Sequence, residues 1–126
     1  MIEMEKTIPV MQQCMQIAET VEKAAEHIQR LLLETEIEQT AYLLEDVVSA
    51  FATVQESMEP IRREIDVMPE IEQQAFELQR ALGQLVDAYE EKDQPKAAEI
   101  AQFTFVPAVK AWRRAIDDTF EAYMEL

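Results

Sequence analysis

The chain has 126 residues and a formal net charge of −15, from 11 basic and 26 acidic residues. Such a charge repels phosphate backbones and anionic lipid headgroups, so we expect neither nucleic acids nor membrane surfaces as partners. Hydrophobic residues make up 48% of the chain, which is typical of a folded domain. The chain has a single glycine, which argues against an all-β fold, because turns and bulges between strands use glycine.

The compartment is predicted from cysteine usage and from the amino terminus. Cys14 is the single cysteine of the chain, so no intrachain disulfide can form, and a reducing compartment is favoured. Residues 1–6 are too acidic and too interrupted to resemble a signal peptide. Even the longest uncharged stretch, residues 7–18, is shorter than the roughly 18 apolar residues that a membrane span needs. We therefore expect a cytoplasmic protein.

The first helix is predicted over residues 8–34. Thr7 can cap it, and Pro9 suits its first turn. Residues 1–7 then form an amino-terminal segment outside the single domain, residues 8–126, and disorder is one interpretation of this segment. Apolar residues recur at spacings of three and four, which is typical of a helix packed into a bundle. This stripe consists of Met11, Cys14, Ala18, Val21, Ala25, Ile28 and Leu32.

The second helix is predicted from Thr35 to Ile65. Thr35-Glu36-Ile37-Glu38 has the form of a capping box, in which hydroxyl and carboxylate each satisfy a free backbone N–H. Pro60 predicts a kink rather than an end, because the stripe stays in phase on both sides of it. The stripe consists of Ile37, Thr40, Leu44, Val47, Phe51, Val54, Met58, Ile61 and Ile65.

Two more helices complete the pattern. The third begins near Pro69, and its Gly83 suggests that a neighbouring helix approaches closely there. The fourth begins with Asp93 as cap and Pro95 in the first turn, and Pro107 predicts a kink. The stripes are Ile71, Ala75, Leu78, Leu82, Leu85 and Tyr89 in the third helix, and Ala98, Ala101, Phe105, Ala108, Trp112, Ala115 and Thr119 in the fourth.

The connections between these helices are short, which places consecutive helices antiparallel. The predicted fold is therefore all-α, a single up-down-up-down four-helix bundle. Apolar positions in the two halves align at shifts of about 57 residues. Two similar helical hairpins would explain this alignment, and so would the spacing common to all bundles.

No catalytic, cofactor-binding or metal-ligating residue is predicted. A di-iron bundle needs two Glu-x-x-His pairs, whereas the single histidine, His27, has Ala24 three residues before it. Cys14 lies on a buried stripe, where cysteine behaves as a small apolar residue. A chain with one glycine has no glycine-rich phosphate loop.

Carboxylate pairs provide the enzyme alternative, a metal-dependent nucleotide phosphohydrolase. Glu-x-x-Glu occurs at Glu19–Glu22 and Glu56–Glu59, and Glu-x-x-Asp occurs at Glu90–Asp93. An inward metal cluster should interrupt an apolar stripe, because buried carboxylates need partners or a metal. No central stripe position is Asp or Glu, so the sequence favours a non-catalytic protein.

The leading hypothesis is a protein-interaction module, either an adaptor, an assembly factor or an export-type chaperone. Small acidic helical chaperones of flagellar or secretion systems are similar in size and composition, which is an analogy only. Apolar residues beyond the stripes are a candidate binding surface for an unknown protein or for a second copy. The alternative is that they belong to a disordered terminus and a wider core. These residues are Ile2, Met4, Val10, Met11, Met15, Tyr42 and Leu43.

One segment carries a family resemblance. Residues 97–112 read AAEIAQFTFVPAVKAW, in which an Ala-rich turn leads through apolar residues to Pro107 and then to Trp112. This segment resembles one in small uncharacterised helical proteins of Gram-positive bacteria. The resemblance implies a bacterial cytosolic helical protein and implies no activity.

Overall fold

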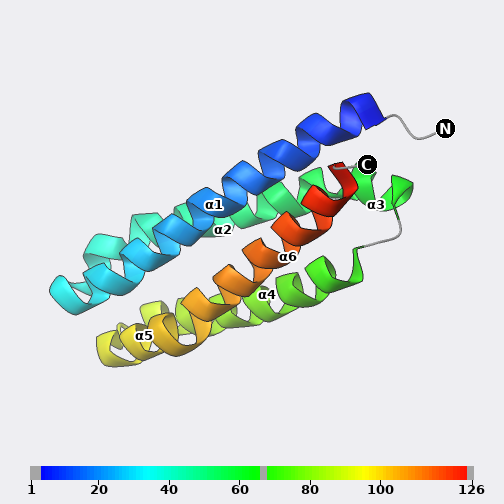
Figure 1. The fold of residues 1–126 in the computed structure, drawn as a ribbon. Coiled ribbons are helices and arrows are strands. Elements are labelled where there is room, and N and C mark those ends of the chain that lie inside the picture. The colour runs from blue at the N-terminus through cyan, green and yellow to red at the C-terminus, as the bar shows by residue number, and fades with distance from the viewer. Residues whose placement is uncertain (1–3, 66–67, 125–126) are drawn as a thin grey trace.

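The computed structural model describes residues 4–65 and 68–124, with side chains from residue 6 onward. Within these ranges all regular structure is helical, which confirms the predicted all-α four-helix bundle (Figure 1). The elements are α1 (Met4–Glu34), the 3₁₀-helix η1 (Ile37–Thr40), α2 (Ala41–Ser57), α3 (Glu59–Glu64), α4 (Pro69–Glu90), α5 (Gln94–Ile100), the π-helix η2 (Ala101–Phe105) and α6 (Val106–Met124).

The bundle consists of two helical hairpins that lie side by side (Figure 1). In the first hairpin α1 packs against α2, and in the second α4 packs against α5, η2 and α6. The hairpins meet mainly where α1 packs along α6, while close backbone approaches between α2 and α4 are sparse. One side of the four-helix square is therefore more open than the other three.

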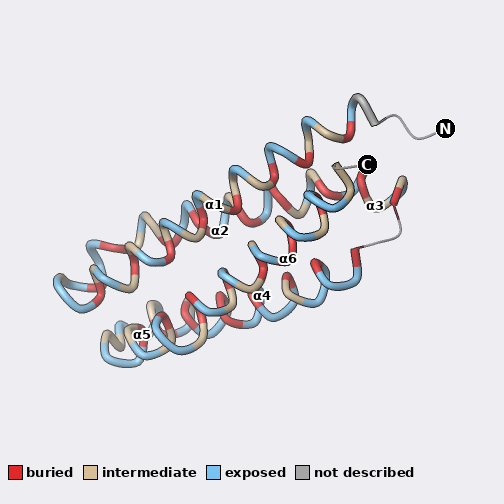
Figure 2. The backbone as a smooth tube through the Cα atoms, viewed as in Figure 1, coloured by how far each residue is buried: buried red, intermediate tan, exposed pale blue. Residues whose placement is uncertain are grey.

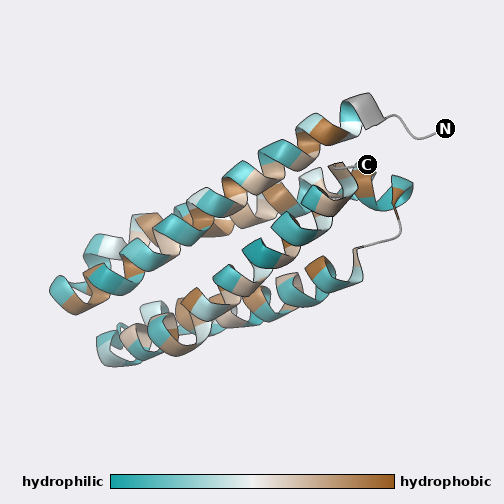
Figure 3. Cartoon of the chain, viewed as in Figure 1, coloured by the Kyte–Doolittle hydropathy of each residue, from teal (hydrophilic) through white to brown (hydrophobic). Residues whose placement is uncertain are grey.

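The core follows the predicted stripes closely. Every predicted stripe residue of the first two helices is buried, and the buried positions of each helix face the bundle interior (Figure 2). Figure 3 shows the complementary pattern, with hydrophilic positions covering most of the outward surfaces. The largest fully buried side chains include Trp112, Phe105 and Phe120 of the fourth helix.

Helix α1 begins at Met4, earlier than the predicted Ile8. Thr7 therefore lies inside the helix and does not cap it. Its Oγ1 donates a hydrogen bond of 2.6 Å to Oε2 of Glu64, which ties α1 to α3. Pro9 is also inside the helix, where the missing N–H removes one backbone hydrogen bond. The rest of the predicted amino-terminal segment, residues 1–3, lies outside the described residues.

The predicted capping box at residues 35–38 does not form. Glu36 occupies the N-cap position of η1 and makes no side-chain capping hydrogen bond. The N–H of Ile37 instead donates to Oε1 of Gln94 at 3.1 Å, so the cap comes from the other hairpin. A hydrogen bond to a residue distant in the sequence therefore takes the place of the expected local capping box.

Near Pro60 the predicted single kinked helix is divided into α2 and α3, with Met58 between them still in the right-handed helical region. Helix α2 stops at Ser57, and α3 starts at Glu59 with Pro60 in its first turn. Proline would clash with the carbonyl of Glu56 in a continuous helix, and it has no N–H to donate to that carbonyl. The stripe nevertheless continues, because Met58 and Ile61 on either side of the proline are both buried.

The fourth helix begins as predicted, with Oδ1 of Asp93 accepting the N–H of Lys96 at 3.2 Å. Before Pro107 the chain forms the π-helix η2 instead of a simple kinked α-helix. A π-turn is wider than an α-turn and therefore brings residues four or five apart onto one face. The buried positions spaced by four, Ala97, Ala101, Phe105 and Val109, fit this geometry.

The core face of the fourth helix consequently differs from the predicted stripe. Ala98, Ala108 and Thr119 were expected in the stripe but are only half-buried. Their places are taken by neighbouring residues that are buried, namely Ala97, Val109, Ile116 and Phe120. The α-helical spacing assumed for the sequence does not allow for the wider turn at residues 101–105.

Candidate functional site

The predicted binding surface is only partly exposed. Val10 and Met15 are half-buried and pack against the core, and Met11 is fully buried with 0% exposure. Met11 therefore belongs to the core and cannot form part of a surface. On α2, Leu43 is half-buried against the core, whereas Tyr42 is 60% exposed.

The structure does not bring these residues together. Val10 and Met15 lie in the first half of α1, whereas Tyr42 and Leu43 lie at the start of α2, at the opposite end of the same hairpin (Figure 1). At 1.5 Å per residue, about 28 Å of helix separates Met15 from the end of α1. Ile2 lies outside the described residues, and the side chain of Met4 is not described. A single continuous patch is thus excluded for the described part of this set.

A groove lies between α2 and α4, on the open side of the bundle. Its volume is about 450 Å³, within the usual range for binding pockets. We call it the α2/α4 groove. Its apolar lining consists of Ile37, Ala41, Leu44, Val48, Val86 and Tyr89. Val48 is 41% exposed, so this apolar surface is accessible from solvent.

Polar contacts join the two hairpins at both ends of the open side of the bundle, where the α2/α4 groove lies. At one end, Oγ1 of Thr40 lies 2.5 Å from Oη of Tyr89. The Thr40 hydroxyl donates its hydrogen to the carbonyl of Ile37 at 2.8 Å, so the Tyr89 hydroxyl is the donor to Thr40. Burial raises the pKa of Tyr89, whereas a Thr40 hydroxyl turned to donate to the phenolate opposes that rise.

At the other end, Nε of Arg62 in α3 lies 2.7 Å from Oε1 of Glu72 in α4. The Thr40–Tyr89 and Arg62–Glu72 contacts show that the second half of the first hairpin, from η1 to α3, runs antiparallel to α4. The α2/α4 groove lies at the Thr40–Tyr89 end of this side, and its lining residues fall between Ile37 and Ser49 and between Val86 and Lys92.

Gly83 corrects another prediction. A Cβ atom added to this exposed glycine would meet nothing within 4 Å, so no neighbouring helix approaches closely there. Phe76 lies two turns before Gly83 on the same face of α4 and is 61% exposed.

The rim of the groove is acidic. The charged residues that line it are Glu38, Glu45 and Glu90 against a single base, Lys92. Within residues 4–65 and 68–124, none of these three carboxylates forms an ion pair. The groove therefore combines an apolar lining with uncompensated negative charge.

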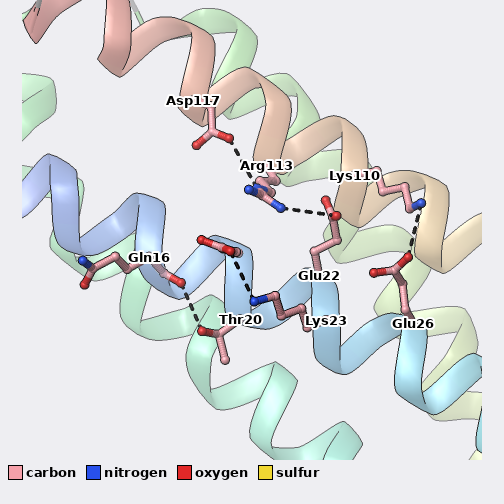
Figure 4. Close-up of polar contacts among 9 residues, drawn as sticks. Gln16, Thr20, Glu22, Lys23, Glu26, Lys110, Arg113 and Asp117 are labelled. Atoms are coloured by element: carbon pink, nitrogen blue, oxygen red, sulfur yellow. Dashed lines mark hydrogen bonds and ion pairs between the residues drawn. The ribbon is translucent and has the colours of Figure 1, made fainter.

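The opposite side of the bundle is different, because acids and bases are paired where α1 packs along α6 (Figure 4). Arg113 contacts Glu22 and Asp117, each at 3.3 Å. Lys110 contacts Glu26 at 3.5 Å. This network of two bases and three acids joins the hairpins through ion pairs.

Two of the three carboxylate pairs of the enzyme alternative have basic neighbours. Glu22 contacts Arg113, Glu19 lies 3.3 Å from Lys23, and Glu59 lies 2.8 Å from Arg62. In the described part of the chain, no three His, Cys, Asp or Glu side chains gather closely enough to hold a metal ion. The Glu-x-x-Glu and Glu-x-x-Asp pairs are thus not assembled into one cluster.

His27 and Cys14, which were considered as a metal ligand and a nucleophile, have no special surroundings. Nδ1 of His27 lies 2.7 Å from Nη2 of Arg30 on the same helix. Cys14 is buried, and this burial raises the pKa of its thiol to about 11, which keeps it protonated and unreactive. Neither residue is near the α2/α4 groove lining.

The sequence reasoning did not find the α2/α4 groove. A partial signal was present, because Val48 and Val86 are apolar residues beside the stripes, each with acidic neighbours along the helix. Whether such residues widen a core or line a groove depends on the distance between helices. The spacing of apolar residues along the chain gives no information about the distance between helices.

The fold and the groove define an acidic four-helix bundle with an open, apolar side. In the described ranges no helix has a stretch long and apolar enough to cross a bilayer. Residues 9–115 match the family described as Domain of unknown function (DUF8042), and the chain belongs to that family. Neither a curated protein nor a solved structure matches the chain significantly.

Proposed function

We propose that this chain is a non-catalytic protein-interaction module, an adaptor, assembly factor or export-type chaperone, which binds its partner in the α2/α4 groove. The observation that carries the proposal is the apolar lining of this groove together with the exposure of Val48. Apolar surface that a bundle leaves open is commonly an interaction site. A cytoplasmic location and a bacterial source are part of the same proposal, motivated by the lone cysteine and by the resemblance of residues 97–112.

Site-specific photo-crosslinking in the native organism tests this function. A photoreactive amino acid replaces Val48 in the groove, and a matched variant carries it at Arg114, an exposed residue on α6. We expect a discrete protein adduct from position 48 that is absent from position 114. Equal adducts from both positions, or none from position 48 at native expression, would contradict the proposal.

A homodimer is a separate proposal. The charge of −15 on each copy opposes self-association, so a dimer should strengthen as salt screens the repulsion. Sedimentation at low and high salt, with the full chain and with a chain that begins at Thr7, measures this. Monomers under all conditions at high micromolar concentration would exclude the homodimer.

The metal-dependent phosphohydrolase is the alternative function, and calorimetry separates it from an interaction module. Titration with Mg²⁺ or Mn²⁺ should give no micromolar binding if the chain is an interaction module. Micromolar binding that disappears in a Glu19→Gln, Glu22→Gln double variant would favour the enzyme. Glu22 also pairs with Arg113, so the double variant must first be shown to remain folded by circular dichroism.

A further inference from the structure

We infer that the partner segment bound in the α2/α4 groove is a cationic amphipathic helix. The inference rests on the proposed function and specifies the partner class. Three features of the groove point to it: its length, its apolar lining and the unpaired acids on its rim.

The length of the groove suits a short helix. Along the first hairpin the lining runs from Ile37 to Ser49, and on α4 it includes Val86 and Tyr89. Twelve residues at about 1.5 Å each give roughly 18 Å, or about three helical turns. A helix of this length presents apolar anchors at positions i, i+3 or i+4, and i+7 to a groove.

The rim determines the charge of the partner. Glu38 and Glu45 are seven residues apart, so they lie on one face of their helical segment and form an acidic row. Glu90 lies across the groove on α4. The acids of the α1/α6 side, Glu22 and Glu26, are already paired with bases, whereas the three rim acids are not. Basic residues beside the apolar anchors of a partner helix would supply the missing counter-charges.

A second copy of this chain fits the groove poorly. It would bring the same net charge of −15 to a rim that is already acidic. Bringing like charges together at an interface is costly, whereas opposite charges speed association and set its specificity. The charge of the rim therefore favours a basic foreign segment over self-association.

Three synthetic peptides of 14 residues test the inference by fluorescence anisotropy with the full chain. The first has leucine at helical spacing and lysine elsewhere. The second has the same composition in an order without an apolar face, and the third has glutamate in place of lysine. We expect the first peptide to bind at least about tenfold more tightly than either of the others, and to weaken as salt is added. Equal binding of the first two peptides would overturn the inference, because it would show non-specific attraction to an acidic protein.

Paired variants locate the binding. Glu45→Lys on the rim and Glu121→Lys on α6 change the net charge equally, and both residues are exposed. We expect Glu45→Lys to weaken the binding of the first peptide by about three- to tenfold, and Glu121→Lys to weaken it by less than about twofold. Val48→Gln should also weaken it, because it removes apolar contact without altering charge. Equal effects of the two lysine variants would place the peptide elsewhere and overturn the inference.

The remaining outcomes separate the partner class from the proposed function. If Val48 crosslinks a protein in cells but the cationic peptide does not bind, the partner class is wrong and the interaction function stands. If neither occurs, both are wrong. A dimer in sedimentation that Val48→Gln abolishes would show that a second copy occupies the groove, which also overturns the inference.

Discussion

The side chain of Gln94 caps the backbone of Ile37 across the end of the bundle. Its Oε1 accepts the Ile37 N–H at 3.1 Å, and its Nε2 donates to the carbonyls of Leu32 and Thr35 at 3.0 and 2.5 Å. Ile37 and Gln94 begin the second helical segment of their respective hairpins and are 57 residues apart. One amide thus satisfies three backbone groups where α1 turns into η1.

Replacing Gln94 by alanine should therefore destabilise the bundle by about 1–3 kcal/mol, because partly buried backbone groups lose their partners. Gln94→Glu keeps the acceptor for Ile37 but removes the two donated bonds, so it should also be destabilising. Chemical denaturation measures both losses. The control is Gln102→Ala, at an exposed position of η2, with an expected change within about 0.5 kcal/mol. A similarly small change in Gln94→Ala would show that water replaces the amide.

Gly83→Ala should stabilise the protein by about 0.5–1 kcal/mol. Alanine has the higher helix propensity, and the added Cβ has no atom within 4 Å to displace. The midpoint of urea or thermal unfolding should rise accordingly. A fall in stability would mean that the added methyl group meets a neighbour, which would contradict the open position of Gly83.

Phe51 and Trp112 join α2 to α6 through the core, with ring centroids 5.3 Å apart and ring planes at 72°. Either residue changed to alanine should cost about 3–5 kcal/mol in the free energy of unfolding. The buried Nε1 of Trp112 has no hydrogen-bond partner in the structure. Trp112→Phe, which keeps an aromatic ring and removes this unpaired donor, should therefore cost clearly less than Trp112→Ala. Losses below about 1 kcal/mol for both alanine variants would contradict their burial.

The thiol of Cys14 should make stability depend on pH at the alkaline end. Burial raises its pKa from 9.0 to about 11 in the folded chain, so between these values the unfolded chain loses the thiol proton and the folded chain keeps it. The contribution of the protonated thiol to the free energy of unfolding is fully present below about pH 9. It is lost as the pH rises toward 11, by roughly 2–3 kcal/mol in total.

Comparison with Cys14→Ala isolates this effect, because Tyr89 and the other alkaline groups titrate in both proteins. The stability advantage of the unmodified chain over Cys14→Ala should shrink between pH 9 and 11, as followed by urea denaturation. A constant difference would show that the thiol has an ordinary pKa. Alkylation of the native chain at pH 8 should likewise be slow, since little thiolate is present.

The helices could be predicted from the sequence because their stripes are local. Spacings of three and four placed Met11 through Leu32 and Ile71 through Leu85 correctly in the core, since burying such a stripe is what makes a helix of this composition stable. The Asp93 cap was also correct, because its partner, the N–H of Lys96, is only three residues away.

The features that could not be predicted depend on contacts between distant residues. The cap of Ile37 comes from Gln94, so the local Thr35 motif was misleading. A glycine inside a helix is consistent both with the close approach of a neighbouring helix and with an open position, and the sequence pattern does not distinguish between them. The groove beside Val48 exists because α2 and α4 are held apart along part of their length, and an apolar pattern contains no information about that separation.

The π-helix at residues 101–105 has a consequence for changes in chain length. A π-turn behaves like an α-helix with one inserted residue, so deleting a residue there should restore a regular α-helix. The faces of α5 and α6 would keep their orientation, with Gln94 still at the hairpin end and Trp112 still in the core. The same deletion in the regular helix α4 would rotate every residue on one side of it by about 100° about the axis. The fourth helix therefore has a place where the deletion of one residue can be absorbed without rearranging the bundle.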